Sequence, residues 1–261
     1  DGHVTGVVSR SEISGPRHRR PWAVVAVALF VAALGAGASP GQALPAEVEA
    51  AITATGKYTY EDSRAFFAPV VEAVRLAASG EALAMRAALS RRLAAALEGD
   101  GTMAGKDLIA RQLVLVADAS TVATLGALLE REDTFHIALR TLGRIEHDAV
   151  DEVLVHRLER APPRRALALI QTLGDRSSPH ATAAIAPYLH NDDDAIARAA
   201  LRALSAIGTE EADHRIDALP TEIAQKLEPE LERAWLLRAE RMLEAGDAEG
   251  AFALCDRLLE R

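Results

Sequence analysis

The stretch DDDAIARAALRALSAIGTEEA, residues 192–212, decides the fold. Its apolar residues recur at intervals of three and four, which places them on one face of a helix from 195 to 207. These residues are Ala197, Ala200, Leu201 and Leu204. A single short helix cannot bury such a face alone, so this pattern predicts partner segments of the same kind elsewhere in the chain.

The same apolar pattern recurs upstream at a nearly constant interval. Its anchor leucines lie 29, 31 and 31 residues apart, at Leu113, Leu142, Leu173 and Leu204. Apolar residues also occur three and four positions before each anchor, and again 12 and 16 positions after it, until Pro220 ends the last row. Each unit is therefore a helix, a turn and a partner helix. This periodicity predicts an all-α fold, a right-handed α-solenoid of stacked helix pairs over residues 103–220.

Residues that commonly begin or end helices occur at the expected ends of the helices in these units. Short polar residues or proline stand where helices should begin, at Ser120, Ser178-Pro179 and Asp192 to Asp194. Glycines stand near the ends of the anchor-bearing helices, where a left-handed residue is expected, at Gly143, Gly174 and Gly208.

Residues 192–212 resemble a HEAT repeat of the short type first named for phycobilisome lyases. In that type an Asp precedes a helix that carries an Arg, followed by Ala-Leu and Ile-Gly. Residues 103–216 resemble four such units, although the earlier ones match the Asp and Arg less well. The resemblance implies an array whose anchor-bearing helices line the concave side. Because HEAT arrays support many unrelated complexes, it implies little about function.

Different segments flank the predicted repeats. Residues 39–102 read as an N-terminal helical cap, with one amphipathic stretch around Phe66 to Leu76 and a second from Ala82 to Leu97. Residues 221–261 form the C-terminal part, in which 234–259 resemble one tetratricopeptide unit with its turn at Gly246-Asp247. The packing positions of that unit would be Trp235, Ala239, Met242, Ala251, Cys255 and Leu258. One such unit cannot build its own core, so it should dock on the preceding helices or be continued in the natural assembly.

The N-terminal residues 1–38 are expected to be a signal peptide or a membrane anchor. A basic cluster at Arg17 to Arg20 precedes an uncharged run at 22–38, which ends in the small residues Ala36-Gly37-Ala38. A cleaved signal peptide is the first interpretation, a single inner-membrane anchor the second and a buried helix the third. The first two place the protein in the bacterial periplasm or cell envelope.

Composition and motifs favour no enzymatic chemistry. A net charge of −9 argues against nucleic-acid binding, and one cysteine excludes an internal disulfide. The chain lacks a nucleophile elbow, a phosphate-binding loop and a dinucleotide fingerprint. We therefore expect no catalytic residues and no cofactor. Cys255 is expected to be a packing thiol, and the adjacent Glu61 and Asp62 are expected to open a helix.

A metal site is also not expected from the histidines. The closest group combines His180 and His190 with the acidic run 192–194, but aspartates at that place are explained by helix capping. The remaining candidates, His136, His147 and His156, fall on separate helices and turns. Neither set has the ligand spacing of a known metal motif.

One row of polar residues suggests a binding surface. Two positions before each anchor stand Arg111, Arg140, Gln171 and Arg202. Equivalent positions line up along a repeat array, so these residues should form one continuous row on its surface. We call it the arginine row, and we expect it to bind carboxylates of a partner protein or an acidic glycan. The alternative is a solvated face whose arginines pair with nearby acids.

The sequence thus favours a non-enzymatic exported scaffold that binds a protein partner. Two other interpretations stay open. One is a bilin-lyase-like or other enzyme-accessory protein, which the HEAT resemblance alone suggests. The other is a self-associating structural protein of the envelope. The sequence does not identify the partner, the oligomeric state or the true start residue.

Overall fold

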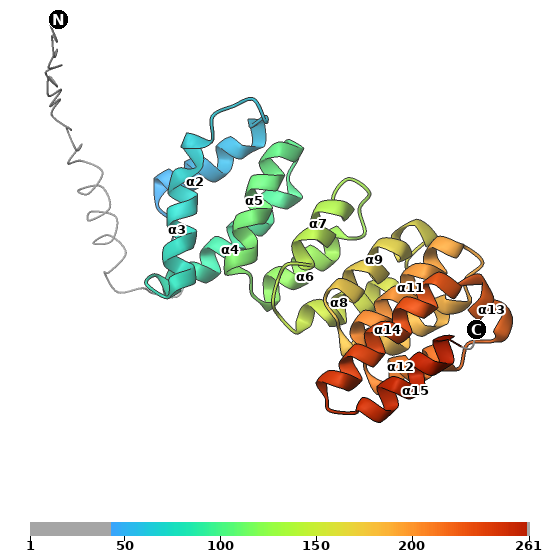
Figure 1. Cartoon of the computed structure of the whole chain (residues 1–261). Helices are drawn as coiled ribbons and strands as arrows, with labels where there is room; N and C mark the ends of the chain where they lie inside the picture. Colours follow the sequence, from blue (N-terminus) through green and yellow to red (C-terminus); the bar gives the residue numbers. More distant parts are fainter. Residues whose placement is uncertain (1–42, 260–261) are drawn as a thin grey trace, which may run out of the picture. The chain divides into compact units, whose positions relative to one another are not determined.

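The structure is a computed structural model that describes residues 43–259, the side chain of residue 257 excepted (Figure 1). The expected targeting segment, residues 1–38, lies outside the described residues. Residues 43–259 are all-helical, with fourteen α-helices, four short 3₁₀ helices and no strand. Within this range, none of the helices combines the length and the apolar character needed to cross a membrane.

The helices follow one another with short connections. The N-terminal ones are α2 (Ala46–Ala54), η1 (Thr55–Lys57), η2 (Arg64–Phe67), α3 (Ala68–Ser79) and α4 (Leu83–Glu98). The central ones are α5 (Met103–Val116), α6 (Ala119–Leu128), α7 (Phe135–Leu142), α8 (Ala149–Leu158), α9 (Pro163–Asp175), η3 (Pro179–Ala181), α10 (Thr182–Ile185), η4 (Ala186–His190), α11 (Asp194–Ile207) and α12 (Glu210–Asp217). The C-terminal ones are α13 (Thr221–Lys226), α14 (Glu228–Glu244) and α15 (Ala248–Leu259).

The helices predicted from the leucine anchors are present. All four anchors are completely buried, and they lie on α5, α7, α9 and α11. The apolar rows before and after the anchors are buried as well, whereas Pro220 is exposed. The partner helices are α6, α8, the broken segment η3–α10–η4, and α12. The pairing differs from the predicted one, because most partner helices pack on the anchor-bearing helix that follows them, α6 on α7, α8 on α9 and η4 on α11, whereas α12 packs on the preceding α11.

Each anchor-bearing helix contacts the next one along the chain. Helix α5 packs against α7, α7 against α9, and α9 against α11, while α6 packs against both α7 and α8 (Figure 1). The same neighbour-to-neighbour contacts continue at both ends, where α3 packs on α5 and α14 on α11. Residues 43–259 accordingly belong to one compact unit, in which α3 and α14 pack directly on the central helices.

The three glycines lie near the ends of the anchor-bearing helices as predicted, but only one of them is left-handed. Gly208 adopts the left-handed conformation with φ of 61° and ends α11, as predicted. Gly143 is right-handed, and Gly174 lies inside α9. A Cβ atom on Gly174 would lie 2.8 Å from the Cα of Ala203 on α11. This glycine is therefore required by the close approach of two helices rather than by a helix end.

The helix N-caps were predicted only in part. Asp193 caps α11, because its carboxylate accepts a hydrogen bond of 2.9 Å from the amide of Ala195. Helix α6, however, is capped by Asp118 rather than by Ser120, whose hydroxyl donates to the same carboxylate. The side chain of Ser178 makes no capping bond to η3. Asp118 precedes Ser120 by two positions and is the stronger acceptor, which explains the shift.

Arginines join successive units through backbone carbonyls. Arg165 donates to the carbonyl oxygens of Leu129 and Glu130, each at 2.9 Å, at the end of α6. Arg176 donates at 2.8 Å to the carbonyl oxygen of Ile145, which follows α7. Further bonds of this kind run from Arg241 to Ser205 and from the hydroxyl of Tyr188 to Leu158. Each satisfies a carbonyl that the end of a helix leaves without an internal partner.

The flanking helices match the predicted ranges with local exceptions. Within the amphipathic stretch from Phe66 to Leu76, Val70 and Val74 are completely buried, whereas Val71 is 45% exposed. In the C-terminal pair the turn at Gly246 is confirmed by its positive φ of 86°. Three of the expected packing residues are buried there, Trp235, Ala239 and Ala251, whereas the others are half-buried, Met242, Cys255 and Leu258.

Candidate functional site

The four members of the arginine row lie on consecutive anchor-bearing helices. Arg111 is on α5, Arg140 on α7, Gln171 on α9 and Arg202 on α11, and all four side chains are exposed. Each precedes a completely buried leucine by two positions, which turns it away from the core. The structure therefore displays this row on the surface of the anchor-bearing helices.

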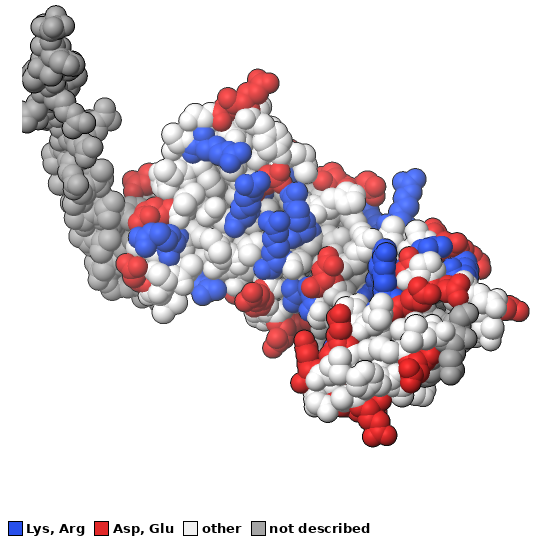
Figure 2. Space-filling model, viewed as in Figure 1, with Lys and Arg blue, Asp and Glu red and all other residues white. Residues whose placement is uncertain are grey.

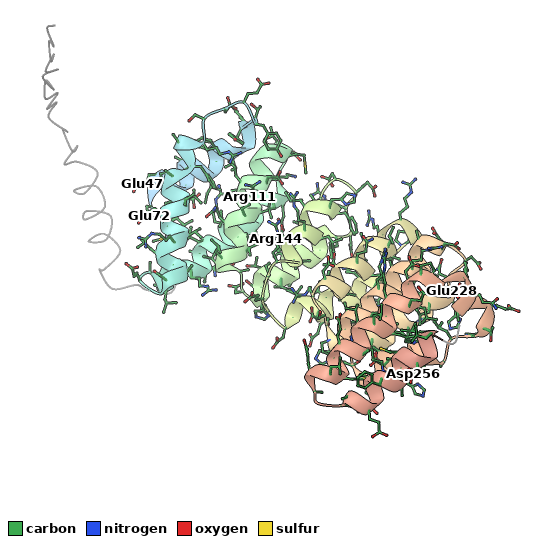
Figure 3. The ribbon with its side chains drawn as sticks, in the orientation of Figure 1. Glu47, Glu72, Arg111, Arg144, Glu228 and Asp256 are labelled. Carbon is green, nitrogen blue, oxygen red and sulfur yellow. The ribbon has the colours of Figure 1, made fainter. Side chains whose placement is uncertain are left out.

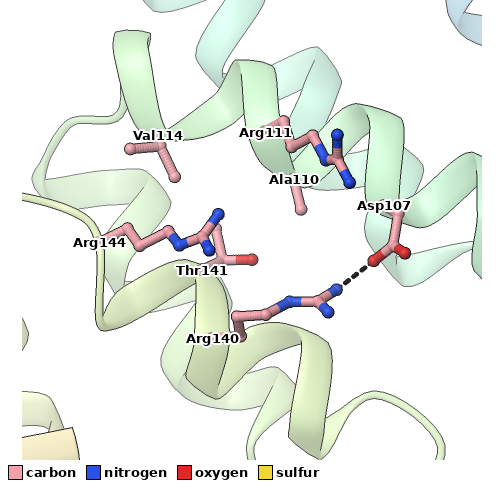
Figure 4. A pocket seen from close by; sticks show the side chains of 7 residues that line it. All are labelled: Asp107, Ala110, Arg111, Val114, Arg140, Thr141 and Arg144. Atoms are coloured by element: carbon pink, nitrogen blue, oxygen red, sulfur yellow. Dashed lines mark hydrogen bonds and ion pairs between the residues drawn. The ribbon is translucent and has the colours of Figure 1, made fainter.

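A small hollow separates α5 from α7, and we call it the first hollow (Figure 4). It is lined by Asp107, Ala110, Arg111, Val114, Arg140, Thr141 and Arg144. Its volume of about 70 Å³ exceeds the space that one water needs and suits a small group rather than an organic cofactor. The first hollow brings two members of the row together and adds Arg144.

Arg144 is a site residue that the sequence analysis missed. It follows the end of α7 and does not share the phase of the arginine row, which lies two positions before each anchor. The periodic pattern therefore could not associate it with Arg111 and Arg140. Its signal in the sequence would have been the spacing of four residues from Arg140, which places both on one side of a helical turn.

The charges in the first hollow are only partly compensated. The guanidinium of Arg140 forms an ion pair with Asp107, whose other carboxylate oxygen accepts a bond of 2.5 Å from the hydroxyl of Tyr60. This hydrogen bond to Asp107 raises the pKa of Tyr60. Among residues 43–259 no carboxylate lies within ion-pair distance of Arg111 or Arg144. Three guanidinium groups therefore face one carboxylate.

Two further hollows continue from the first one. The second hollow, between α7 and α9, is about 480 Å³ and shares Arg140 and Arg144 with the first. The third hollow, between α9 and α11, is about 380 Å³ and shares Gln171 and Asp175 with the second. Arg202 lines the third hollow. The shared residues connect the hollows into one groove that crosses four helices.

Positive charge is concentrated at one end of this groove. The first hollow contains three arginines and one aspartate, whereas the third contains Arg202 and Asp175. Figure 2 shows Lys and Arg side chains gathered over the α5–α7 region of the visible face, while acidic side chains are frequent over the C-terminal helices. The alternative prediction, that the arginines pair with nearby acids, describes Arg140 but not Arg111, Arg144 or Arg202 within the described part of the chain.

The charged side chains of the first hollow are three arginines and one aspartate. Arginine stays protonated at any ordinary pH and cannot act as a general base. The one hydroxyl that lines the first hollow belongs to Thr141, which is buried and donates to the carbonyl oxygen of Ile137. Charge-assisted hydrogen bonds to an oxyanion are the interaction that this arrangement supports.

Of the other candidate residues, His136 lines the second hollow, and the rest line none of the three hollows. In residues 43–259 no three His, Cys, Asp or Glu side chains are grouped as metal ligands would be, the histidines of the sequence analysis included. Cys255 is half-buried on α15. Asp62 accepts hydrogen bonds from the amide and hydroxyl of Thr59, which lower its pKa, so it stabilises a turn rather than opening a helix as expected.

Comparison with known proteins finds no counterpart of this chain. No protein-family model, no curated protein and no solved structure matches it. The chemistry of the groove is therefore derived from its own residues.

Proposed function

We propose that this chain is a non-enzymatic α-solenoid scaffold that holds an anionic segment of a partner protein in the groove over α5, α7, α9 and α11. The proposal rests on one observation, that the three hollows adjoin one another. Neighbouring hollows share the lining residues Arg140 and Arg144, and then Gln171 and Asp175. A repeat array of the HEAT type, which residues 103–216 resemble, would present such a surface on a rigid support.

The dimensions of the groove suit an extended peptide. Packed helices lie about 8–10 Å apart, so four neighbouring helices span roughly 30 Å. An extended chain rises about 3.3 Å per residue, and about nine residues would cross the groove. Exposed guanidinium groups would bind acidic side chains, and the amide of Gln171 would bind the peptide backbone.

The location is part of the same proposal. The basic cluster and the uncharged run of residues 17–38 would direct the chain to the periplasm or cell envelope, with or without cleavage. The partner is then a protein of that compartment.

Substitution of the row tests the proposal. We expect the triple variant Arg111→Gln, Arg140→Gln and Arg202→Gln to lose capture of the partner from envelope extracts, because the charge-assisted bonds are gone. The control variant removes three exposed arginines outside the groove, Arg91, Arg164 and Arg233, which have no ion pair among residues 43–259. Circular dichroism should show both variants folded, with the triple variant less stable because Asp107 loses its ion pair with Arg140. Equal capture by both variants would contradict the proposal.

Self-association is a second candidate, favoured by a separate observation. Large apolar side chains are exposed on the C-terminal helices, at Leu236, Leu243, Phe252 and Leu259. An exposed apolar patch commonly marks a contact surface. Sedimentation velocity over a hundredfold range of concentration checks this candidate, and a constant monomer excludes it.

A further inference from the structure

We propose that the first hollow is a binding site for a phosphoryl group, carried on a side chain of the partner segment. This inference deepens the proposed function, because it assigns a specific anion to one end of the groove. It rests on the charge, the direction of the donors and the size of the hollow.

The charge of the hollow matches a dianion. Arg140 and Asp107 neutralise one another as an ion pair, which leaves the charges of Arg111 and Arg144 without a partner among the described residues. The remaining charge of about +2 corresponds to that of a phosphate monoester, which carries about −1.5 to −2 at neutral pH. A single carboxylate would leave half of this charge uncompensated.

The donors approach from different elements of the fold. Arg111 projects from α5, Arg140 from α7 and Arg144 from the segment after α7, and their guanidinium groups border the same hollow (Figure 4). Figure 3 labels Arg111 on α5 and Arg144 in the turn after α7, and both line the first hollow. A planar carboxylate offers its acceptor sites in one plane, whereas the three oxygens of a phosphoryl group accept donors from several directions. The arrangement therefore favours a tetrahedral group.

The hollow is small, and one side of it is held in place. Its volume of about 70 Å³ provides room for a few waters or one compact oxyanion. Asp107 is mostly buried and is fixed by the hydroxyl of Tyr60, so it orients Arg140 toward the hollow. Such positioning lowers the ordering cost when an anion binds.

The source of the phosphoryl group follows from the surroundings. The first hollow is continuous with the second one through Arg140 and Arg144, so the backbone that carries the group can continue toward α9. Free inorganic phosphate would use only the first hollow. A phosphorylated peptide would bind more tightly than phosphate, because it adds contacts in the second hollow.

Calorimetric titration of the chain at pH 8 tests the inference. The probes are inorganic phosphate, malonate, acetate and a nine-residue peptide with one phosphoserine, at constant ionic strength. We expect phosphate to bind at least tenfold more tightly than malonate or acetate, and the phosphopeptide more tightly than phosphate. In the variants Arg111→Gln and Arg144→Gln the phosphate affinity should fall about tenfold or more, whereas Arg91→Gln, an exposed arginine on α4, should leave it unchanged.

The outcomes separate this inference from the proposed function. Malonate or acetate binding as tightly as phosphate, or phosphate binding that survives both Arg111→Gln and Arg144→Gln, would overturn the phosphoryl site. A phosphopeptide that binds no more tightly than phosphate would overturn its assignment to a peptide. If the phosphoryl site is overturned but capture of the partner still depends on the arginine row, the scaffold proposal remains supported. Unfolding temperatures equal to that of the parent chain show that the variants are folded.

Discussion

Arginine side chains have two distinct roles in this chain, and their partners distinguish them. Arg165, Arg176 and Arg241 bind carbonyl oxygens of the preceding unit and also pair with carboxylates. Arg111 and Arg144 border a hollow and have no carboxylate partner in the part of the chain that the structure describes. The sequence predicted the position of Arg111, because it shares the phase of the repeat. The sequence did not reveal which arginines donate to backbone carbonyls of the preceding unit, because those hydrogen bonds depend on where the helices end.

The largely buried ion pair of Arg176 should contribute far more to the free energy of unfolding than an exposed ion pair of an arginine with a carboxylate. Its side chain is 13% exposed and its Nε lies 2.6 Å from a carboxylate oxygen of Asp151. We expect Arg176→Ala to lower the free energy of unfolding by about 3 kcal/mol, because a largely buried carboxylate and a carbonyl lose their donor. Urea denaturation followed by circular dichroism measures this. Arg75→Ala removes an exposed pair with Glu72 and should cost less than about 1 kcal/mol.

Asp118 should make the stability of α6 depend on pH. Burial alone would raise its pKa, but hydrogen bonds from Ser120 and Thr121 outweigh that effect and lower it below the ordinary value of 3.8. A carboxylate with a lowered folded pKa stabilises the fold above the unfolded pKa, and this stabilisation is lost as pH falls through the folded pKa. Asp118→Ala should therefore cost about 1 kcal/mol at pH 7 and progressively less below about pH 4. A cost that stays constant down to pH 2 contradicts this account.

At the scale of elements, periodicity predicted the helices well and their boundaries less well. The helix pairs of the central region follow from burial at a period of three to four residues, which one helix face requires. The breaking of the third partner helix into η3, α10 and η4 was not predicted, although Pro179 and Pro187 lie within it. The role of Gly174 could not be predicted either, because it depends on the distance between α9 and α11, which no local pattern encodes.

Gly174 should be required for the contact between α9 and α11. A Cβ atom there would lie 2.8 Å from both Cα and Cβ of Ala203, which forces the helices apart. Overpacking of this kind costs roughly 1–3 kcal/mol, and the better helix propensity of alanine recovers about 1 kcal/mol. We expect Gly174→Ala to lower the free energy of unfolding by about 1 kcal/mol, measured by urea denaturation. Ala203→Gly should cost less in the Gly174→Ala background than in the parent chain, because it removes one of the two close contacts. No loss at all in Gly174→Ala would contradict the close contact.

Gly56 offers the matched control for this substitution. Nothing lies within 4 Å of a Cβ atom built on it, and its φ is not positive. Gly56→Ala should therefore change the free energy of unfolding by less than about 0.5 kcal/mol. Equal losses at Gly56 and Gly174 would show that the effect does not come from helix packing.

At the scale of the whole described region, each helix packs mainly against helices that are near to it in the chain. The anchor-bearing helices α5, α7, α9 and α11 contact one another in chain order, and α3 and α14 pack on the two ends of this series, so equivalent residues line up on one surface. This alignment is why the sequence could predict that Arg111, Arg140, Gln171 and Arg202 share a face. The hollows between the helices could not be predicted, because their depth depends on small residues such as Ala110 and Ala203 that also occur in the core.

The central claim is that a partner lies in the groove across these helices. Site-specific photo-crosslinking tests it most directly, with the cross-linking residue placed at position 171 in the middle of the groove and, as a control, at the exposed Ala95 on α4. We predict one stoichiometric adduct from position 171 in envelope extracts, and its loss when Arg111, Arg140 and Arg202 are also replaced by glutamine. An adduct that forms equally from position 95, or that persists in the triple variant, would contradict the account.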